Sequence, residues 1–382
     1  MDHTLGYAPD ELDDRGAGTT AHEIAQQPAL WREVAKNIST QRAEHQDFLA
    51  PLLQRTDLRI VLTGAGTSSY AGEVLAPALR RRLRRRVDAV ATTDLVADPH
   101  AFLSEDVPTL LVSFSRSGDS PEGVAATRLA DQLLSECRHL VLTCNPEGEL
   151  YREHMGSSSA MVMLMPEAAN DQGFAMTSSF TCMVLATHLV LSGDEPDETV
   201  HRLATAAERA LPRIAERTRA LVAAGYERFV YLGSGALTGL AHESALKLLE
   251  LTAGQVVTHA DTPLGFRHGP KAVLNDRTLA LVYVSNDSYT RRYDLDLVEE
   301  LRRSMDPASV IVLAAEETPG QDLWYLPGLD GLDDVPLSLC FVLVAQTIAL
   351  HASLHLGHAP DDPFPSKEVN RVVQGVTIHA LD

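Results

Sequence analysis

Short apolar runs alternate with amphipathic stretches through the first half of this 382-residue chain. Runs of about five residues rich in Val, Ile and Leu are typical of buried strands. We expect such strands at residues 59–63, 87–91, 109–114, 139–143 and 160–165. Helices fit between them, and a long helix at 178–192 closes the set. This alternation predicts a parallel sheet that is covered by helices on both faces.

After an amphipathic helix at 201–223 the pattern begins again. The second series contains a helix at 239–251, a strongly apolar helix at 336–356, and strands at 228–232, 278–284 and 309–313. Two copies of one unit explain this repetition. The predicted fold class is α/β, with two tandem, doubly wound parallel-sheet domains of three αβα layers. Residues 1–18 read as a polar leader, and residues 19–49 are expected to be helical. We divide the chain into a leader and helix at 1–45, a first domain at 46–200 and a second domain at 201–382.

The composition narrows the classes of function. A formal net charge of −20 argues against nucleic-acid and membrane-surface partners, because an acidic surface repels polyanions. The basic run at 80–86 fits a solvated helix end. Four cysteines without a recognisable pairing pattern predict neither a disulfide framework nor a zinc site, and no signal-peptide pattern opens the chain. We therefore expect a cytoplasmic protein in which the apolar segment 337–350 is a buried helix.

Small hydroxyl residues follow two of the expected strands. One stretch reads Gly64-Ala65-Gly66-Thr67-Ser68-Ser69, and the other reads Ser115-Arg116-Ser117-Gly118-Asp119-Ser120 before Pro121. Backbone N–H groups and hydroxyls where a strand turns into a helix can hold a phosphate dianion. A glycine turn and a serine N-cap are the ordinary alternatives. The pair of stretches favours the phosphate, and since neither matches a P-loop or a dinucleotide fingerprint, a phosphomonoester is expected.

A charged stripe runs along the helix expected at 239–251. Glu243, Lys247 and Glu250 have the i, i+4, i+7 spacing that places them on one helix face, while most other positions are apolar. Charges on such a helix pair internally or line a cavity. A structural ion-pair ladder and a catalytic stripe are both consistent with the pattern, and the phosphate loops favour the catalytic one.

Several segments together resemble one known family, the tandem sugar isomerase (SIS) domain proteins. Residues 22–28 are similar to the start of the isomerase half of glucosamine-6-phosphate synthase. The two hydroxyl stretches, residues 243–250, 267–270 and 376–378 then follow in the family's order. Residues 266–271 and 370–375 resemble the group formerly labelled tagatose-6-phosphate ketose/aldose isomerases, which is linked to deamination of galactosamine 6-phosphate.

The resemblance implies roles for individual residues. It implies Glu250 as the base that moves a proton between C1 and C2, with Lys247 one turn before it, and His268 as the acid that opens the sugar ring. His268 acts in a neighbouring subunit in the relatives, so a homodimer, or a dimer of dimers, is implied. The implied contacts to the phosphorylated amino sugar are Thr67, Ser68, Ser115, Arg116, Ser117, Ser120, Thr177, Ser178 and Glu243.

Three further residues carry weaker expectations. Lys271 is an alternative cation, a phosphate contact or a surface residue, and His259 and Asp261 are secondary candidates near His268. The synthases form an imine through a lysine where this chain has Gln374, which puts a covalent imine in doubt.

The leading hypothesis is a deaminating isomerase that converts galactosamine 6-phosphate to tagatose 6-phosphate and free ammonia. It needs neither a metal nor an organic cofactor. The alternatives are a glucosamine-6-phosphate deaminase, a plain ketose/aldose phosphate isomerase and a non-catalytic sugar-phosphate sensor.

Overall fold

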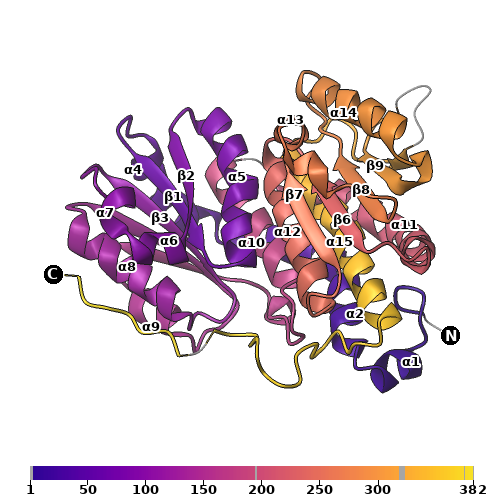
Figure 1. Ribbon diagram of the computed structural model, residues 1–382. Coiled ribbons are helices and arrows are strands. Elements are labelled where there is room, and N and C mark those ends of the chain that lie inside the picture. Colours follow the sequence, from indigo (N-terminus) through magenta and orange to yellow (C-terminus); the bar gives the residue numbers. More distant parts are fainter. Residues whose placement is uncertain (1–2, 194–195, 318–322, 374, 382) are drawn as a thin grey trace. The chain divides into compact units, whose positions relative to one another are not determined.

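The computed structural model describes residues 3–193, 196–317, 323–373 and 375–381. The chain forms two compact units, each built from segments that are distant in sequence (Figure 1). One unit consists of Leu30–Asp171, Ser178–Asp197 and Ser366–Asp382, and the other of Met1–Ala29, Gln172–Thr177 and Glu198–Pro365. The domain boundaries predicted after residues 45 and 200 stay a prediction. The compact units are defined by contacts between segments that are distant in sequence, and a sequence repeat does not reveal such contacts.

The first unit contains a parallel sheet with the strand order β2-β1-β3-β4-β5. All residues of β1 and β3 are buried, as expected for central strands of a sheet covered on both faces. The strands are β1 Arg59–Gly64, β2 Arg86–Ala91, β3 Thr109–Ser115, β4 Cys137–Thr143 and β5 Ala160–Leu164. Helices α6 Thr92–Ala97 and α8 Pro121–Leu133 cover one face, with α7 Pro99–Phe102 beside α6, and α9 Glu149–His154 beside β4 and β5. Helix α5 Thr67–Leu83 packs on β1 and β2, and α10 Ser178–Ser192 packs on α5.

The second unit repeats this plan with the strand order β7-β6-β8-β9-β10. Its strands are β6 Arg228–Leu232, β7 Val257–Asp261, β8 Thr278–Tyr283, β9 Val310–Ala314 and β10 Trp324–Tyr325. Helix α12 Ala236–Leu251 packs on β6 and β7 and on α15 Asp334–His355. Helix α14 Thr290–Ser304 packs on β8 and β9. The two sheets and their helix layers confirm the predicted fold class.

The remaining helices include several that the sequence pattern did not separate. Residues 19–49, expected to be helical, form α2 Gly18–Ala25, α3 Gln27–Thr40 and part of α4 Arg42–Leu53. Pro28 has no N–H to continue the bonding of α2, which ends at Ala25, and the new helix α3 begins at Gln27. The leader contains α1 Pro9–Asp14, and α11 Pro196–Ala223 begins earlier than expected. The short elements are α13 Pro263–Phe266 and the 3₁₀ turns η1 Glu167–Ala169, η2 Pro270–Val273 and η3 Pro307–Ser309.

Helix α15 is the most apolar helix of the second unit. By length and composition it could cross a membrane, but the whole of its apolar window is buried inside the protein. Two of its buried polar side chains find partners there: Gln27 Nε2 donates to Gln346 Oε1 at 2.7 Å, and Thr218 Oγ1 lies 3.0 Å from His351 Nδ1. The prediction of a buried helix is confirmed.

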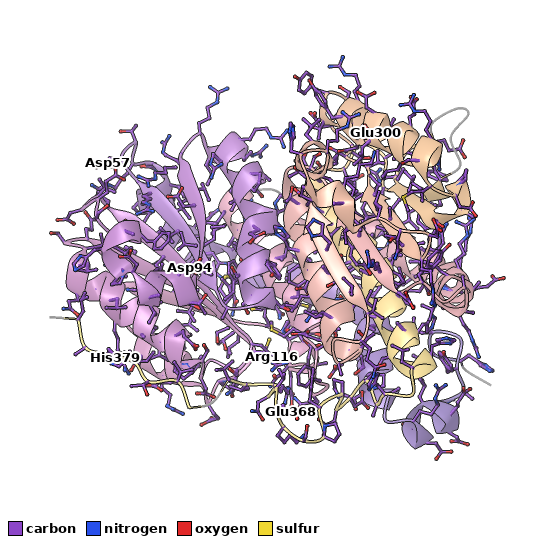
Figure 2. The ribbon with its side chains drawn as sticks, in the orientation of Figure 1. Asp57, Asp94, Arg116, Glu300, Glu368 and His379 are labelled. Carbon is purple, nitrogen blue, oxygen red and sulfur yellow. The ribbon has the colours of Figure 1, made fainter. Side chains whose placement is uncertain are left out.

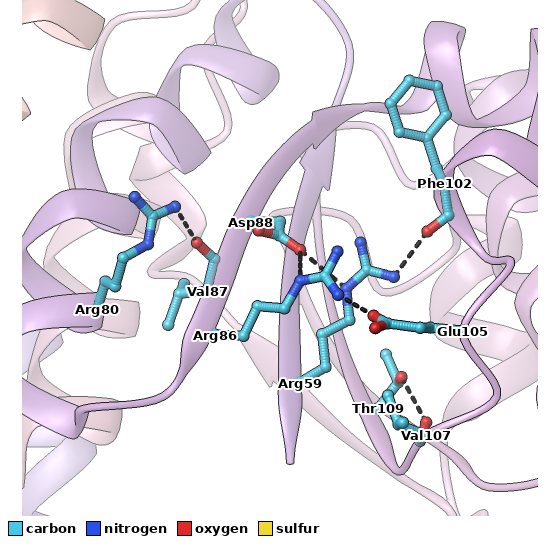
Figure 3. A network of polar contacts seen from close by, with 9 residues as sticks. All are labelled: Arg59, Arg80, Arg86, Val87, Asp88, Phe102, Glu105, Val107 and Thr109. Carbon is cyan, nitrogen blue, oxygen red and sulfur yellow. Dashed lines mark hydrogen bonds and ion pairs between the residues drawn. The ribbon is translucent and has the colours of Figure 1, made fainter. Parts of the chain in front are cut away.

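Figure 3 shows the ion pairs at the start of β1. The buried Arg59 guanidinium donates from Nε to Asp88 Oδ2 at 2.8 Å and from Nη1 to the Phe102 carbonyl at 2.7 Å. Arg86 binds the same Asp88 oxygen at 2.9 Å, but half of its side chain is exposed. The two arginines therefore share one partner and differ in burial.

We predict that Arg59→Met lowers the free energy of unfolding by about 2 kcal/mol, because buried hydrogen bonds from a charged group are lost. The matched change Arg86→Met is expected to cost less than about 1 kcal/mol, since water replaces an exposed ion pair. Urea denaturation of both variants measures this difference. Equal losses would show that the burial of Arg59 does not add to the stability that its ion pair gives.

Candidate functional site

The two hydroxyl stretches leave neighbouring parallel strands. β1 pairs with β3 along its length, so both stretches begin at the same edge of the first sheet. Gly66 has φ 57° and ψ −127°, a conformation that favours glycine, and a β-carbon at Gly64 would lie 2.6 Å from the backbone carbon of Ser68. The turn therefore requires both glycines. Thr67 and Ser68 are buried in the first turn of α5, which starts at Thr67.

Within the second stretch, hydroxyl oxygens accept from backbone N–H groups. Ser115 Oγ accepts from the Gly118 amide at 3.1 Å, and Ser117 Oγ accepts from the Asp119 amide at 3.2 Å. Ser120 Oγ caps α8 through the Gly123 amide at 3.3 Å, so the ordinary N-cap interpretation of Ser120 is correct. A hydroxyl that accepts from the backbone still carries its own proton to donate. Ser120 Oγ also donates to Glu122 Oε2 at 3.0 Å, so the O–H groups of Ser115 and Ser117 are the ones that stay able to meet an anion.

Arg116 lies in the same loop and is only 5% exposed. Its Nη2 donates to the Arg371 carbonyl at 3.1 Å, which ties the loop to the C-terminal segment (Arg116 is labelled in Figure 2). A buried guanidinium adjoining several hydroxyls creates a positive site, because burial strengthens its field. This arrangement suits a phosphate group.

A third turn precedes α10 and contains a residue that the sequence analysis missed. The buried carboxylate of Asp171 accepts from the backbone amides of Ser178 and Ser179, both at 2.9 Å. Asp171 therefore caps α10 and uses the amide of Ser178. Thr177 and Ser178 are both buried. The only sequence signal for this cap is an aspartate seven residues before the helix, which is too distant for an ordinary N-cap pattern.

On α12 the structure brings the charged stripe together. Lys247 Nζ lies 2.5 Å from Glu250 Oε2 and 3.7 Å from Glu243 Oε1. Glu243 and Lys247 are buried, whereas a quarter of the Glu250 side chain is exposed. The ammonium thus joins a buried carboxylate to one that solvent or a ligand can reach. The ion pairs of the structural alternative are therefore present. They leave the Glu250 carboxylate accessible.

His268 lies in an exposed turn between α13 and η2. Glu300 on α14 clamps both sides of this turn, with Oε2 2.6 Å from Arg267 Nη2 and Oε1 2.5 Å from Lys271 Nζ (Glu300 is labelled in Figure 2). The hydrogen bond from Lys271, and then that from Arg267, holds the pKa of Glu300 below its usual range. Sequence reasoning missed Glu300 because its helix was not expected. Lys271 is engaged by Glu300, which favours a role in holding the His268 turn.

The secondary candidates lie on strand β7. His259 Nε2 is 3.8 Å from Asp261 Oδ2, and Asp261 Oδ1 accepts from the Thr262 amide at 2.6 Å. Asp261 therefore stabilises the chain turn that leads into α13. Gln374 lies outside the described residues.

One group of described residues has metal-ligand spacing. Ligand atoms of Asp131, Cys137 and His139 lie within 4.8 Å of one another, and His139 Nε2 is 2.8 Å from Asp131 Oδ1. Sequence reasoning missed His139, which lies two residues after Cys137. Since the imidazole and carboxylate already satisfy each other, these contacts need no metal. The cysteines that the structure describes are all free thiols.

The chain is similar to several known proteins. The family model for the SIS domain matches residues 52–193. A provisionally named D-galactosamine-6-phosphate deaminase AgaS from Streptomyces coelicolor is 60% identical over 374 residues, covering 97% of each chain. The D-galactosamine-6-phosphate deaminase AgaS of Escherichia coli is 46% identical over 366 residues, covering 94% of this chain and 95% of the relative. The chain belongs to the AgaS family.

The crystal structures agree with this membership. A Clostridium novyi NT protein, described provisionally as a tagatose-6-phosphate ketose/aldose isomerase, matches this AgaS-family protein with a TM-score of 0.95 and 39% identity. The match covers 100% of both chains. The resemblance inferred from the sequence motifs is confirmed.

We predict that Lys247→Met destabilises this AgaS-family protein by about 3 kcal/mol, because the buried Glu243 carboxylate loses a neighbouring ammonium. Lys271→Met is the matched control, since it removes a part-exposed lysine from Glu300, and it should cost less than about 1 kcal/mol. Denaturant midpoints of both variants test the difference. A Lys247 variant as stable as the Lys271 variant would contradict the burial argument.

Proposed function

We propose that this AgaS-family protein is a deaminating aldose–ketose isomerase that converts D-galactosamine 6-phosphate and water to D-tagatose 6-phosphate and ammonia. The observation that carries the proposal is the Lys247–Glu250 pair on α12, which presents a part-exposed carboxylate beside a buried ammonium. The names of the Streptomyces coelicolor and Escherichia coli relatives support the substrate.

In the proposed reaction the phosphate is held by the hydroxyl loops at the edge of the first sheet. Arg116 supplies positive charge, and the other proposed phosphate contacts are Thr67, Ser68, Ser115, Ser117 and Ser120. Thr177 and Ser178 are proposed as hydroxyl contacts to the sugar. Fixing the phosphate holds the far end of the sugar in place, so that the reacting carbons meet the catalytic groups in one orientation. Glu243 acts through Lys247, whose position it fixes.

Proton transfer then follows in a balanced sequence. His268 protonates the ring oxygen as the ring opens to the C1 aldehyde. Glu250 removes the C2 proton while the aldehyde oxygen gains a proton, which gives an enolamine. Glu250 then returns its proton at C1 while the nitrogen loses one, which leaves a hydroxyl at C1 and a ketimine at C2. Water adds to C2 and ammonia departs, giving the ketose phosphate. We assign Lys247 to holding the Glu250 carboxylate at the reacting carbons.

A plain ketose/aldose phosphate isomerase is the second candidate, since the Clostridium novyi NT structure carries that description. Both reactions use the same proton transfer and differ in whether C2 bears an amine or an oxygen. We further propose a homodimeric, cytoplasmic enzyme with no cofactor. The exposed His268 supports the dimer, and the free thiols support the cytoplasmic location.

The first test is a substrate panel with a Glu250 variant. Ammonia and ketose phosphate should appear in equal amounts from galactosamine 6-phosphate and more slowly from glucosamine 6-phosphate. Glu250→Gln should lower kcat by about 10³-fold, because the base is lost, with little change in binding of the sugar phosphate. Glu299→Gln, on the exposed surface of α14, is the control and should keep full activity.

Each other outcome of this panel has a meaning. Isomerised sugar without ammonia supports the plain isomerase, and binding without either product supports a sensor. Full activity of the Glu250 variant would exclude Glu250 as the base.

Subunit complementation tests the role of His268. We predict that Glu250→Gln and His268→Asn each inactivate the enzyme alone, and that co-expression restores roughly a quarter of wild-type activity. In a mixed dimer, one site then combines an intact Glu250 with an intact His268 from the other chain. A lack of recovery in mixed dimers that are shown to form would place His268 in its own chain's site.

A further inference from the structure

The two sheets correspond residue by residue at their strand-to-helix turns. Strands β1 and β6 begin at Arg59 and Arg228, and β3 and β8 begin at Thr109 and Thr278, so the spacing is 169 in both cases (228 minus 59, 278 minus 109). Helices α8 and α14 begin at Pro121 and Thr290, with the same spacing. The second copy therefore has an equivalent for each residue of the two hydroxyl loops.

The backbone of the first loop is preserved in the second copy. Gly235 has φ 59° and ψ −122°, close to the values of Gly66, and a β-carbon at Gly233 would lie 2.4 Å from the Leu237 carbonyl oxygen. The side chains are not preserved. Ser68 is replaced by Leu237, and Ser115 by Val284. The second copy has kept the shape of an anion loop but lacks the hydroxyls of Ser68 and Ser115.

A buried carboxylate joins the two loops of the second copy. Asp294 on α14 is fully buried, and its equivalent in the first copy is Ala125 on α8. Asp294 Oδ1 accepts from the Ser234 hydroxyl at 2.5 Å, and Oδ2 accepts from the Ser285 amide at 3.0 Å. Ser234 belongs to the first turn and Ser285 to the second. Both carboxylate oxygens thus bind the loops that correspond to the proposed phosphate loops.

We propose that the second sheet retains a small-anion site whose resident anion is the Asp294 carboxylate. Such a site takes a planar carboxylate such as formate once the aspartate is cut back to the alanine found in the first copy. The proposal stands on the geometry of the second sheet and does not depend on the reaction proposed above. It explains why only one of the two copies is open to a phosphorylated ligand.

The surroundings of Asp294 fit an occupied anion site. Burial is the largest influence and raises its pKa to about 6, while hydrogen bonds from Ser234 and Ser285 and the nearby Arg291 guanidinium oppose this rise. Asp334 lies nearby and accepts from Ser285 Oγ at 2.6 Å and from the Asn286 amide at 3.0 Å. Burying a carboxylate costs free energy unless donors bind it, so Asp294 needs the Ser234 hydroxyl and the Ser285 amide. Without Asp294, these two donors would lose this acceptor.

The experiment removes the resident anion and supplies it again. In full-length Asp294→Ala, a methyl group replaces the side chain and formate can complete the lost carboxylate. We expect the variant to have a lower Tm than the wild type and sodium formate to raise that Tm by about 3 °C more than equimolar sodium chloride does. Wild type should show no formate-specific rise, because the site is filled.

Two further variants separate a specific site from general effects. Asp294→Asn keeps the volume filled and should gain nothing from formate. Asp306→Ala removes the exposed cap of η3 and should behave like wild type toward formate. The proposal is overturned if Asp294→Ala shows no formate-specific gain, including the case in which it stays insoluble at every formate concentration. If the wild type lacks deaminase activity while Asp294→Ala responds to formate, the proposed reaction is wrong and the proposed anion site is supported.

Discussion

The structure depends on one recurring constraint: a parallel strand that turns into a helix leaves backbone N–H groups that must find an acceptor. Three turns meet this need with side chains close by. The Gly118 amide donates to the Ser115 hydroxyl, the Ser179 amide to the Asp171 carboxylate, and the Ser285 amide to the Asp294 carboxylate. A hydroxyl acceptor is neutral and keeps a proton to donate, whereas a carboxylate acceptor fills the turn with negative charge. The choice of acceptor therefore decides which turn is open to an anionic ligand.

This constraint accounts for the different contents of the two copies. In the first copy, the turn after β3 has serine acceptors and the buried Arg116, which together leave a positive, hydroxyl-lined loop. The second copy has the carboxylate acceptor Asp294 at its turns, and its proposed catalytic groups Lys247 and Glu250 lie on α12. There Lys247 is buried against Glu243, and burial of both charges is tolerated because each offsets the desolvation of the other. The same lysine pairs with the accessible Glu250, so one ion-pair network joins a buried carboxylate to the proposed base.

The exposed His268 turn is held by charges as well as by its buried neighbour Phe266. The His268 turn has little buried surface of its own, and its two neighbouring cations both bind Glu300. Because Lys271 and Arg267 hold the pKa of Glu300 below its usual range, this clamp stays charged over a wide range of pH. A clamp of this kind fixes the turn while leaving the imidazole free to reach outward. The exposed histidine is consistent with the proposed action in a neighbouring subunit.

The sequence by itself determined the repeated α/β architecture, the two hydroxyl loops and the stripe on α12, because these features follow from local periodicity and from residues close in the chain. It missed β7, whose residues are mostly half-buried and do not alternate, and α14, whose residues are mostly polar. Only the tertiary structure decided the partners of the turns. Asp294 meets Ser234 across 60 residues, and Glu300 meets Lys271 across 29. Such contacts arise from strand order and helix packing, which bring distant residues together without leaving a pattern in the local sequence.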